Sequence, residues 1–301
     1  MAREIRFLRR DQIEAAHWDA CVDASPDARV YALSWYLDLV APDWNALVLG
    51  DYEAVFPLPT NRKLLGLPQV YAPLLCQQLG PFSPLPHPEH TARFLAEATK
   101  RWYWRFSLPL HAHATAPLGP PWRIRKLPNF VLRLDKPYAQ LQAAYSENHR
   151  RNVRKAHLAG LRFGPDGLSP RDFIAGIRLH QQTKGNRVPS AVYPLALRLL
   201  ESALQNGHGL LLVATDPHTL KPYAAAFWLR YQNRWTDLLN LTLPEGRASG
   251  AMHGLVNHLV QSRADTGEIL DFEGSSIPSL ARFYSGFGAT DEPFWMCEKG
   301  W

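Results

Sequence analysis

The chain has 301 residues, and its 33 basic side chains exceed its 27 acidic ones to give a net charge of +6. With 46% hydrophobic and 20% charged residues it has a globular composition, which excludes a disordered chain, and at roughly 150 residues per domain its length favours two domains. The charge suits a protein that handles phosphates, but it is too small to require a nucleic-acid partner.

Cysteine usage and hydropathy predict a cytoplasmic protein without stable membrane insertion. Cys21, Cys76 and Cys297 are too far apart for a disulfide framework or a zinc spacing, and a reducing cytoplasm is the simplest interpretation. The N-terminal stretch is charged and lacks the apolar core of a signal peptide. Apolar runs such as "GLLLVAT" are too short to span a bilayer.

The first half of the chain alternates short apolar runs with helical patterns. In chain order we expect a strand at 5–10, helices at 11–24 and 34–41, strands at 44–50 and 54–59, a helix at 88–103 and a strand at 105–110. Two proline-rich stretches between these elements are expected to be ordered connectors. His111 and His113 lie in one of them at a metal-like spacing, but no third ligand is evident, so we expect no metal site.

The second half gives a clearer pattern. We expect a strand at 130–135, a helix at 138–159, a strand at 161–163, a helix capped by Ser169 and running to 183, and a helix within 191–205. Strands at 209–215, 222–231 and 234–243 follow, then a helix at 248–264, a strand at 268–272, a helix at 278–284 and a strand at 293–299.

This order of elements resembles the GNAT acyltransferase fold, and the first half resembles it more weakly. The predicted fold class is therefore α/β (α+β), with two tandem GNAT-like domains whose mixed sheets are flanked by helices. We expect the N-terminal domain at residues 1–129 and the C-terminal domain at residues 130–301.

A basic face is predicted on the helix at 138–159. At about 100° per residue, four cations lie opposite the apolar side chains of this helix. They are Arg150, Arg151, Arg154 and Lys155. A solvated helix face and a phosphate-binding surface both fit the pattern, because like charges repel unless an anion is present and arginine suits phosphate. A non-catalytic nucleic-acid-binding protein that uses this face is one alternative function.

Three segments resemble the FemABX peptidyltransferases of the GNAT superfamily, in the same order along residues 130–289. They are "LQAAYSENHRRNVRKAHLAGLRF", "HQQTKGNRVPSAVYPLALRLLESA" and "ILDFEGSSIPSLARFYSGFGA". The resemblance implies transfer of an acyl or aminoacyl group to an amine. FemABX enzymes use aminoacyl-tRNA to extend peptidoglycan precursor peptides, and related N-acyltransferases acting on small amines use acyl-CoA. It also implies that the loop with Lys184 and Arg187 lies near the acceptor; an exposed basic loop is the plain alternative.

A phosphate-binding loop is expected at "RASGAMHG". GNAT enzymes bind the CoA pyrophosphate with a Q/R-x-x-G-x-G/A loop between a strand and a helix, where backbone N–H groups hold the anion. Arg247 and Gly250 match this pattern, whereas Met252 occupies the last position in place of a small residue. The donor is expected to be acyl-CoA or aminoacyl-tRNA, with no permanently bound cofactor and no metal.

Candidate acid and base groups follow the strand at 268–272. Asp271 and Glu273 alternate along it, so both are candidates for the base that deprotonates the amine. Tyr284 is a candidate acid for the leaving group, although an aromatic residue at helical spacing also fits a core position. No nucleophile motif is present, so direct transfer without a covalent intermediate is expected.

Overall fold

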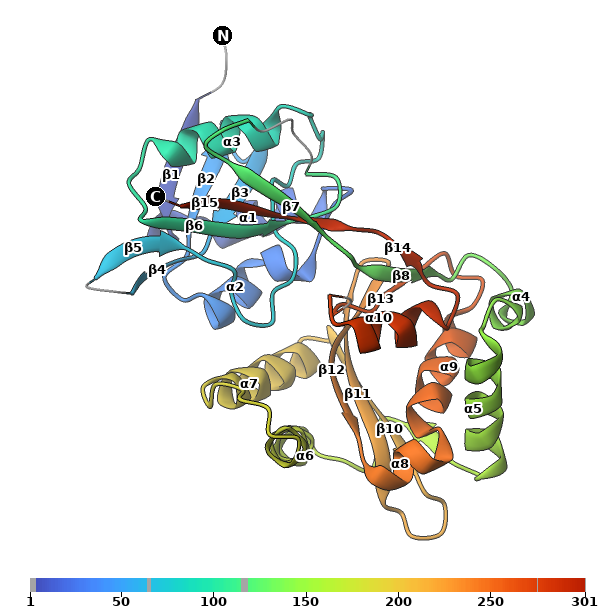
Figure 1. Ribbon diagram of the computed structural model, residues 1–301. Coiled ribbons are helices and arrows are strands. Elements are labelled where there is room, and N and C mark those ends of the chain that lie inside the picture. Colours follow the sequence, from blue (N-terminus) through green and yellow to red (C-terminus); the bar gives the residue numbers. More distant parts are fainter. Residues whose placement is uncertain (1–3, 64–65, 115–118, 275, 301) are drawn as a thin grey trace. The chain divides into compact units, whose positions relative to one another are not determined.

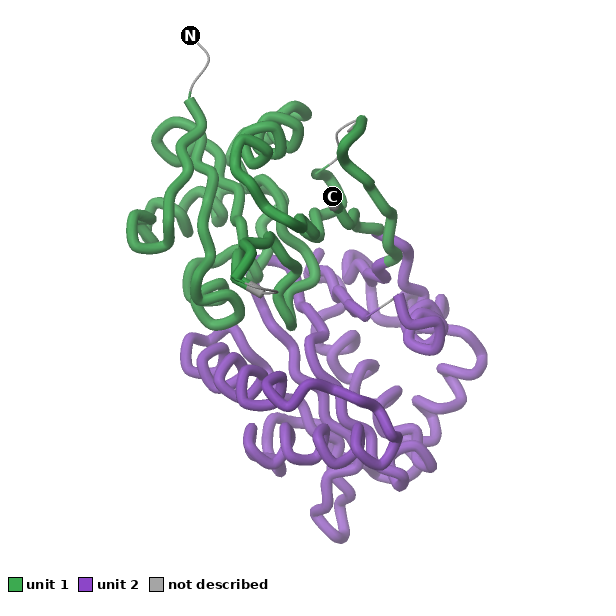
Figure 2. The backbone as a smooth tube through the Cα atoms, turned by 60° about the vertical axis from the view of Figure 1, so that its left-hand side comes forward, with its two compact units in different colours: residues 1–128, 293–301 green, residues 129–292 purple. Residues whose placement is uncertain are grey.

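The computed structural model describes residues 4–63, 66–114, 119–274 and 276–300. The chain forms two compact units, which Figure 2 distinguishes: unit 1 comprises residues 1–128 and 293–301, and unit 2 comprises residues 129–292. Both are mixed α/β structures with sheets flanked by helices, so the predicted fold class is confirmed. The strand expected at 293–299 forms, but it pairs within unit 1 and not with the rest of the second half.

Unit 1 contains a three-stranded and a five-stranded sheet (Figure 1). The first has the order β1-β2-β3 and is antiparallel; the second has the order β4-β5-β6-β15-β7, with only β5 and β6 parallel. The elements are β1 (Ile5–Arg9), α1 (Ala15–Asp23), α2 (Ser34–Val40), β2 (Asn45–Leu49), β3 (Ala54–Leu58), β4 (Thr60–Lys63), β5 (Leu67–Val70), α3 (His90–Thr99), β6 (Arg105–Leu110), β7 (Arg123–Leu127) and β15 (Phe294–Gly300).

Unit 2 is built on a seven-stranded sheet of order β14-β8-β13-β12-β11-β10-β9, in which only β12 and β13 are parallel. Its elements are β8 (Phe130–Arg133), α4 (Tyr138–Ala143), α5 (Glu147–Leu158), β9 (Arg162–Gly164), α6 (Pro170–Thr183), α7 (Val192–Gln205), β10 (Gly209–Thr215), β11 (Pro222–Tyr231), β12 (Arg234–Thr242), α8 (Pro244–Ser249), α9 (Ala251–Arg263), β13 (Ile269–Asp271), α10 (Pro278–Ser285) and β14 (Thr290–Asp291).

Helices cover both faces of this sheet, with α5 and α9 on one side and α6 and α7 on the other (Figure 1). Alternate side chains of β11, such as Ala226 and Trp228, pack into the core beneath α5 and α9. The intervening residues Ala225 and Phe227 are also fully buried, which explains why the strand reads as a continuous apolar run.

Two expected helices are each divided in the structure. The helix expected at 138–159 stops after α4, and α5 begins anew because the Ser146 side chain caps it by accepting a hydrogen bond from the His149 N–H. The helix expected at 248–264 begins earlier, as α8, and Gly250 separates it from α9 with a left-handed φ of 73°. The predicted cap of α6 is confirmed, because Ser169 accepts a hydrogen bond from the Asp172 N–H.

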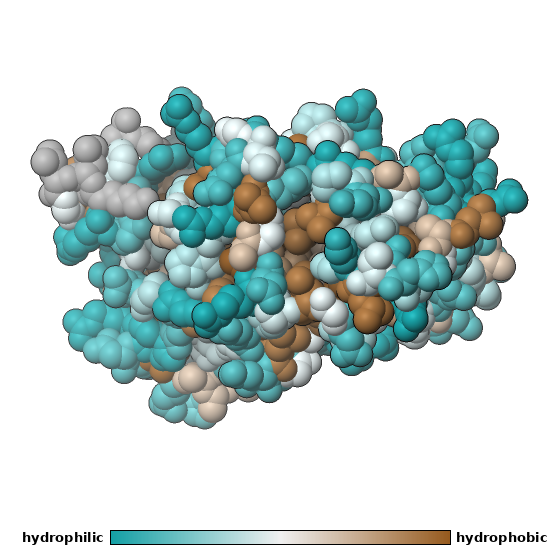
Figure 3. Space-filling view, turned by 90° about the horizontal axis from the view of Figure 1, so that it is seen from below, coloured by the Kyte–Doolittle hydropathy of each residue, from teal (hydrophilic) through white to brown (hydrophobic). Residues whose placement is uncertain are grey.

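The face of the molecule drawn in Figure 3 is mainly hydrophilic, with hydrophobic side chains in small groups between polar ones. In the part of the chain that the structure describes, no helix combines the length and the apolar character needed to cross a membrane.

Candidate functional site

A cavity of about 690 Å³ opens in unit 2 where β12 and β13 separate. The two strands pair in parallel only as far as Thr236 and Asp271, and the cavity is lined by the residues that follow, in β12 and in the loop after β13. A register shift between β11 and β12 places a bulge at Leu238 in the same region. The remaining walls come from α6, α8, the first turn of α9, the loop after β13, and α10.

Two carboxyl groups and a phenol lie at one end of this cavity. Burial raises the pKa of Asp237 to about 8, although both of its oxygens accept hydrogen bonds from the Asn240 amide at 2.9 Å. Burial also raises the pKa of Glu273 to about 8. The pKa of Tyr284 is raised well above its usual value by burial and by the nearby carboxyl groups, so its hydroxyl stays protonated.

Aromatic and apolar side chains surround these groups. The ring of Phe272 stacks on Tyr284 at a centroid distance of 4.7 Å, and Phe283 lies edge-on to His253 at 4.9 Å. Burial, together with the neighbouring His149, lowers the pKa of His253 to about 4, so its imidazole is neutral at physiological pH. The carboxyl groups therefore lie in a cavity whose wall also contains aromatic and apolar side chains.

Basic groups on α6 and α8 also line the cavity. An Arg247 guanidinium nitrogen, on α8, lies 2.9 Å from Nε2 of His180 on α6, and Lys184 follows at the end of α6. Burial and the charges of Lys184 and Arg247 lower the pKa of His180. The lining of the cavity thus contains both carboxyl groups and cations.

The structure brings five of the residues expected from the sequence into this one cavity. Its lining includes Lys184, Arg247, Gly250, Glu273 and Tyr284. A group attached at Gly250 would lie only 2.5 Å from the Asn152 carbonyl oxygen, so the glycine is required by the packing of α9 against α5.

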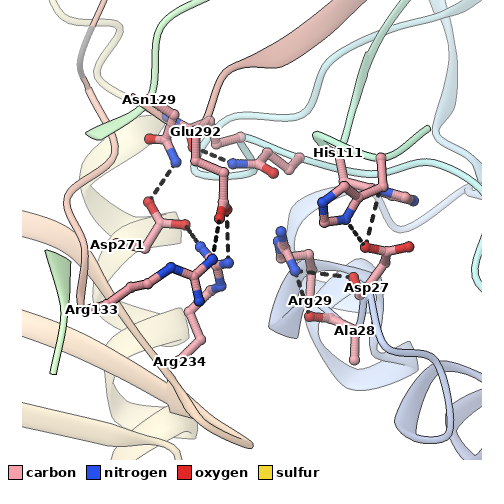
Figure 4. A network of polar contacts seen from close by, with 12 residues as sticks. Asp27, Ala28, Arg29, His111, Asn129, Arg133, Arg234, Asp271 and Glu292 are labelled. Carbon is pink, nitrogen blue, oxygen red and sulfur yellow. Dashed lines mark hydrogen bonds and ion pairs between the residues drawn. The ribbon is translucent and has the colours of Figure 1, made fainter. Parts of the chain in front are cut away.

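Asp271 lies outside the cavity, in a buried ion-pair network (Figure 4). It accepts hydrogen bonds from Arg234 at 2.6 Å and from the Asn129 amide at 2.9 Å. The same guanidinium contacts Glu292 at 2.8 Å. Because Asp271 is 1% exposed and already paired, its position suits a structural role.

The remaining cations that the sequence singled out do not line the cavity. They are Arg150, Arg151, Arg154, Lys155 and Arg187, and all are exposed. On α5, Arg150 donates to the Ala143 carbonyl and Arg151 to the Asn148 side chain. The outer face of α5 is therefore a basic surface separate from the cavity.

Sequence reasoning missed three titratable residues of the cavity: Asp237, His180 and His253. A carboxylate within the apolar strand pattern at 234–243 was the available signal for Asp237, because charged residues are rarely buried without a role. The two histidines lie within segments that the sequence singled out, "HQQTKGNRVPSAVYPLALRLLESA" and "RASGAMHG", but the resemblance assigned no role to either of them.

Unit 1 holds the histidine pair for which no metal was expected. His111 is buried near Asp27 (Figure 4), and its Nε2 lies 2.9 Å from the Pro81 carbonyl. Nδ1 of His113 lies 2.5 Å from an Asp27 carboxylate oxygen. Among the described residues no cluster of three or more histidine, cysteine or acidic side chains has a geometry that could bind a metal ion.

No family model matches the sequence, and no curated protein matches it. Among solved structures, FemX covers 97% of this chain and 96% of its own, with a TM-score of 0.68 at 12% identity. The match to L-PGS from Bacillus licheniformis covers 94% of this chain and 91% of that chain, with a TM-score of 0.55 at 13% identity. A tandem GNAT protein from the clavulanic acid biosynthesis pathway covers 98% of both chains, with a TM-score of 0.51 at 13% identity.

These structures span nearly the whole chain, and they confirm its resemblance to FemABX-like proteins with tandem GNAT domains at the level of the fold. At such low identity the comparison establishes the architecture alone.

Proposed function

We propose that the protein is a transferase that moves an acyl or aminoacyl group to an amine, and that the reaction takes place in the cavity of unit 2. The proposal rests on the Glu273 carboxyl group, whose pKa of about 8 suits a general base and which lines the cavity where β12 and β13 separate. The tandem GNAT-like fold supports the same reaction class.

The proposed reaction needs no covalent intermediate. Ionised Glu273 takes a proton from the acceptor ammonium, and the amine nitrogen then attacks the acyl carbon. The bond from this carbon to the donor sulfur or oxygen breaks as the C–N bond forms. The attacking nitrogen loses one further proton to solvent as the amide forms. Tyr284 gives its proton to the leaving atom and regains one from solvent, while Glu273 releases its proton to solvent. The apolar walls hold the reactants together and limit access of water.

Two donors fit this proposal, and both carry phosphates. Aminoacyl-tRNA would agree with a FemABX-like role on a peptidoglycan precursor peptide, and acyl-CoA would agree with N-acylation of a small amine. Thermal unfolding of the protein with CoA, acetyl-CoA or aminoacyl-tRNA would separate them, because only a ligand that binds the folded state raises Tm. Loss of that stabilisation in Arg247→Ala would locate the donor in this cavity.

The Glu273→Gln substitution tests the catalytic proposal. It keeps the size of the side chain but removes the titrating group, so we expect kcat to fall by about 100-fold or more. In the wild-type enzyme kcat/KM should rise with pH through about 8 and level off above it, because only the ionised form accepts a proton. This rise should be absent in the variant.

Glu245→Gln is the matched control, since Glu245 is exposed on α8 and does not line the cavity. The pH dependence of kcat/KM should be measured with two acceptors whose amines differ in pKa. If the pH of the rise changes with the acceptor, the titrating group is the substrate amine and not Glu273. Full activity of Glu273→Gln with an unchanged pH profile would exclude Glu273 as the base.

A second candidate function is nucleic-acid binding through the outer face of α5. The supporting observation is that Arg150, Arg151, Arg154 and Lys155 are exposed on one helix and lie outside the cavity. Binding through phosphate contacts should weaken steeply with salt and be lost when Arg151 and Arg154 are both changed to Glu. Binding that is insensitive to salt, or no binding, would eliminate this function.

A further inference from the structure

Unit 1 has a cavity of its own, and the histidine pair of this unit lies in its wall. The cavity measures about 210 Å³, which admits several water molecules or one small organic molecule. Its lining includes the polar side chains of Asp27, His111 and His113, together with three proline residues and Ala114. None of these residues belongs to unit 2, so this cavity is separate from the candidate active site.

One ring nitrogen of His111 is a buried hydrogen-bond acceptor in this cavity. Its Nε2 lies 2.9 Å from the Pro81 carbonyl oxygen, which can only accept, so Nε2 carries a proton. Burial lowers the pKa of His111 to about 4, so the ring is neutral at physiological pH and Nδ1 has a free lone pair. Among the described residues no donor contacts Nδ1, although the residue is only 2% exposed. A buried acceptor without a donor is destabilising, so this nitrogen is suited to a donor from a ligand.

The ring of His111 is held in place by its neighbours. Its backbone N–H donates to the Leu79 carbonyl at 2.6 Å, and its ring lies against Phe82 at a centroid distance of 5.4 Å. Gly80 has a positive φ of 132°, and a group attached to it would lie 2.7 Å from Cδ2 of the same ring. The ring therefore occupies space that only a glycine at position 80 leaves open, and the direction of its Nδ1 lone pair is defined.

A carboxylate lies beside this nitrogen. Oδ1 of Asp27 is 3.9 Å from Nδ1 of His111, and Figure 4 shows the two side chains facing one another. Neither group can donate to the other, and the separation is too long for a hydrogen bond, but one nitrogen with several N–H groups can donate to both. Asp27 is 7% exposed, and its backbone N–H donates to Oγ of Ser25 at 3.3 Å. The two acceptors are thus already in place.

The charge at this point favours a cation. In the described part of the chain the ion pairs of Asp27 are both with histidines, His111 and His113, and a histidine is charged only when protonated. His111 stays neutral, and His113 is exposed. The Arg29 guanidinium donates to the backbone carbonyls of Asp27 and Ala28 (Figure 4). A buried carboxylate whose ion pairs are with histidines alone is suited to an ammonium group.

We propose that this cavity of unit 1 binds a small primary ammonium compound, whose nitrogen donates hydrogen bonds to Nδ1 of His111 and to the Asp27 carboxylate. The short aliphatic part of the ligand packs against the rings of Pro81, Pro86 and Pro88, which line the cavity. A water molecule could donate to the same two acceptors, but it carries no charge for Asp27 and has no aliphatic part. The site lies within unit 1, so binding does not depend on the proposed transferase reaction.

Titration of the full chain with propylammonium chloride at constant ionic strength tests the site. Nitrogen–proton NMR correlation of the histidine side chains provides the readout, and we expect a saturable change in the Nδ1 resonance of His111 as its lone pair accepts a hydrogen bond. Propanol has the same chain without the charge, and tetramethylammonium has the charge without an N–H group. Both should bind more weakly than propylammonium by about tenfold or more, as expected for the loss of a charge-assisted hydrogen bond.

Asp27→Asn should weaken the binding of propylammonium by about tenfold or more, because it keeps the size of the side chain and removes its charge. Asp51→Asn is the matched control, since Asp51 is an exposed carboxylate of unit 1 that does not line the cavity. Its affinity for propylammonium should equal that of the wild type.

Three results would overturn the inference. They are the absence of a saturable change at His111 with propylammonium, which would leave the cavity to water alone, equal affinities for propylammonium and tetramethylammonium, and an Asp27→Asn variant that keeps the wild-type Tm and affinity. The comparison of the three probes uses the wild-type chain, so it decides the question even if Asp27→Asn does not fold. The Glu273→Gln activity test concerns unit 2, and its outcome is independent of all three.

Discussion

Identical carboxyl groups differ in unit 2 in their pairing and their pKa because of what surrounds them. Asp271 is neutralised by Arg234, whereas Glu273, two residues later, faces the cavity with a raised pKa. Their alternation along a strand suggested that both face one site. The alternation ends because β13 stops at Asp271 and Glu273 adopts a left-handed φ of 42°, which redirects its side chain.

Asp237→Asn should change the pH dependence of stability. The pKa of Asp237 rises from about 4 in an unfolded chain to about 8 in the fold, so its contribution to stability is present at low pH and is lost as pH rises to 8. The asparagine does not titrate. The Tm of Asp237→Asn, relative to that of the wild type, should therefore increase as the pH rises from 5 through 8 and then level off.

Thermal unfolding at unit pH intervals measures this difference. Asp216→Asn is the contrasting control, because hydrogen bonds from Thr219 lower the pKa of Asp216 to about 2 and place its titration below this range. Parallel Tm curves for wild type and Asp237→Asn between pH 5 and pH 9 would contradict the assignment.

The sequence could predict the residues of the site that belong to motifs, but not the burial of individual side chains. Lys184, Arg247, Glu273 and Tyr284, which the sequence singled out on separate grounds, line one cavity, and their roles stay predictions. Asp237 and His180 gain their properties from tertiary packing, which desolvates the first and brings the second against Arg247. No periodicity in a single sequence reports such contacts.

At the level of elements, the order of the strands and helices of unit 2 was predictable, and the helix breaks were not. In the helix expected at 138–159, the apolar side chains keep a helical period through Tyr145 and Val153, both of which are buried. This period therefore does not indicate that a second helix, α5, begins after Ser146. Gly250 similarly lies within a helical pattern, and only its close approach to Asn152 explains the left-handed backbone that separates α8 from α9.

Gly250→Ala should destabilise the protein through two effects. A side chain at φ 73° costs roughly 1–2 kcal/mol, and the new methyl group would lie 2.5 Å from the Asn152 carbonyl oxygen, so α9 would have to move away from α5. Gly267→Ala separates the two effects, because Gly267 has the same φ of 73° and no atom within 4 Å of the added group. Urea unfolding should show a larger loss for Gly250→Ala, and equal losses would refute the packing argument.

At the scale of the whole molecule, the two units are not consecutive pieces of sequence. The last strand was predicted from its own pattern, but a strand pattern does not identify its partners. In the structure β15 lies between β6 and β7 in the five-stranded sheet of unit 1. The ion-pair network around Arg234 joins the two ends of unit 2, because it includes Asn129, the first residue of the unit, and Glu292, the last.

Met296→Pro should therefore unfold unit 1 and spare unit 2. Met296 pairs with Pro109 on one side and Arg125 on the other, and proline within a central strand removes a ladder hydrogen bond and clashes with its neighbours. Unit 2 keeps its complete sheet and its own hydrophobic core, neither of which includes a residue after Glu292. Limited proteolysis should cleave the variant within residues 4–128 and leave a resistant fragment near 129–292.

Asn61→Pro is the control for this experiment, because β4 is an edge strand of the same sheet and pairs only with β5. It should be milder, since edge strands tolerate proline better than central ones. If Met296→Pro made both units equally susceptible, unit 2 would depend on unit 1 for its stability. The resistant fragment, by contrast, would mean that the cavity and its carboxyl groups are maintained by residues 129–292 alone.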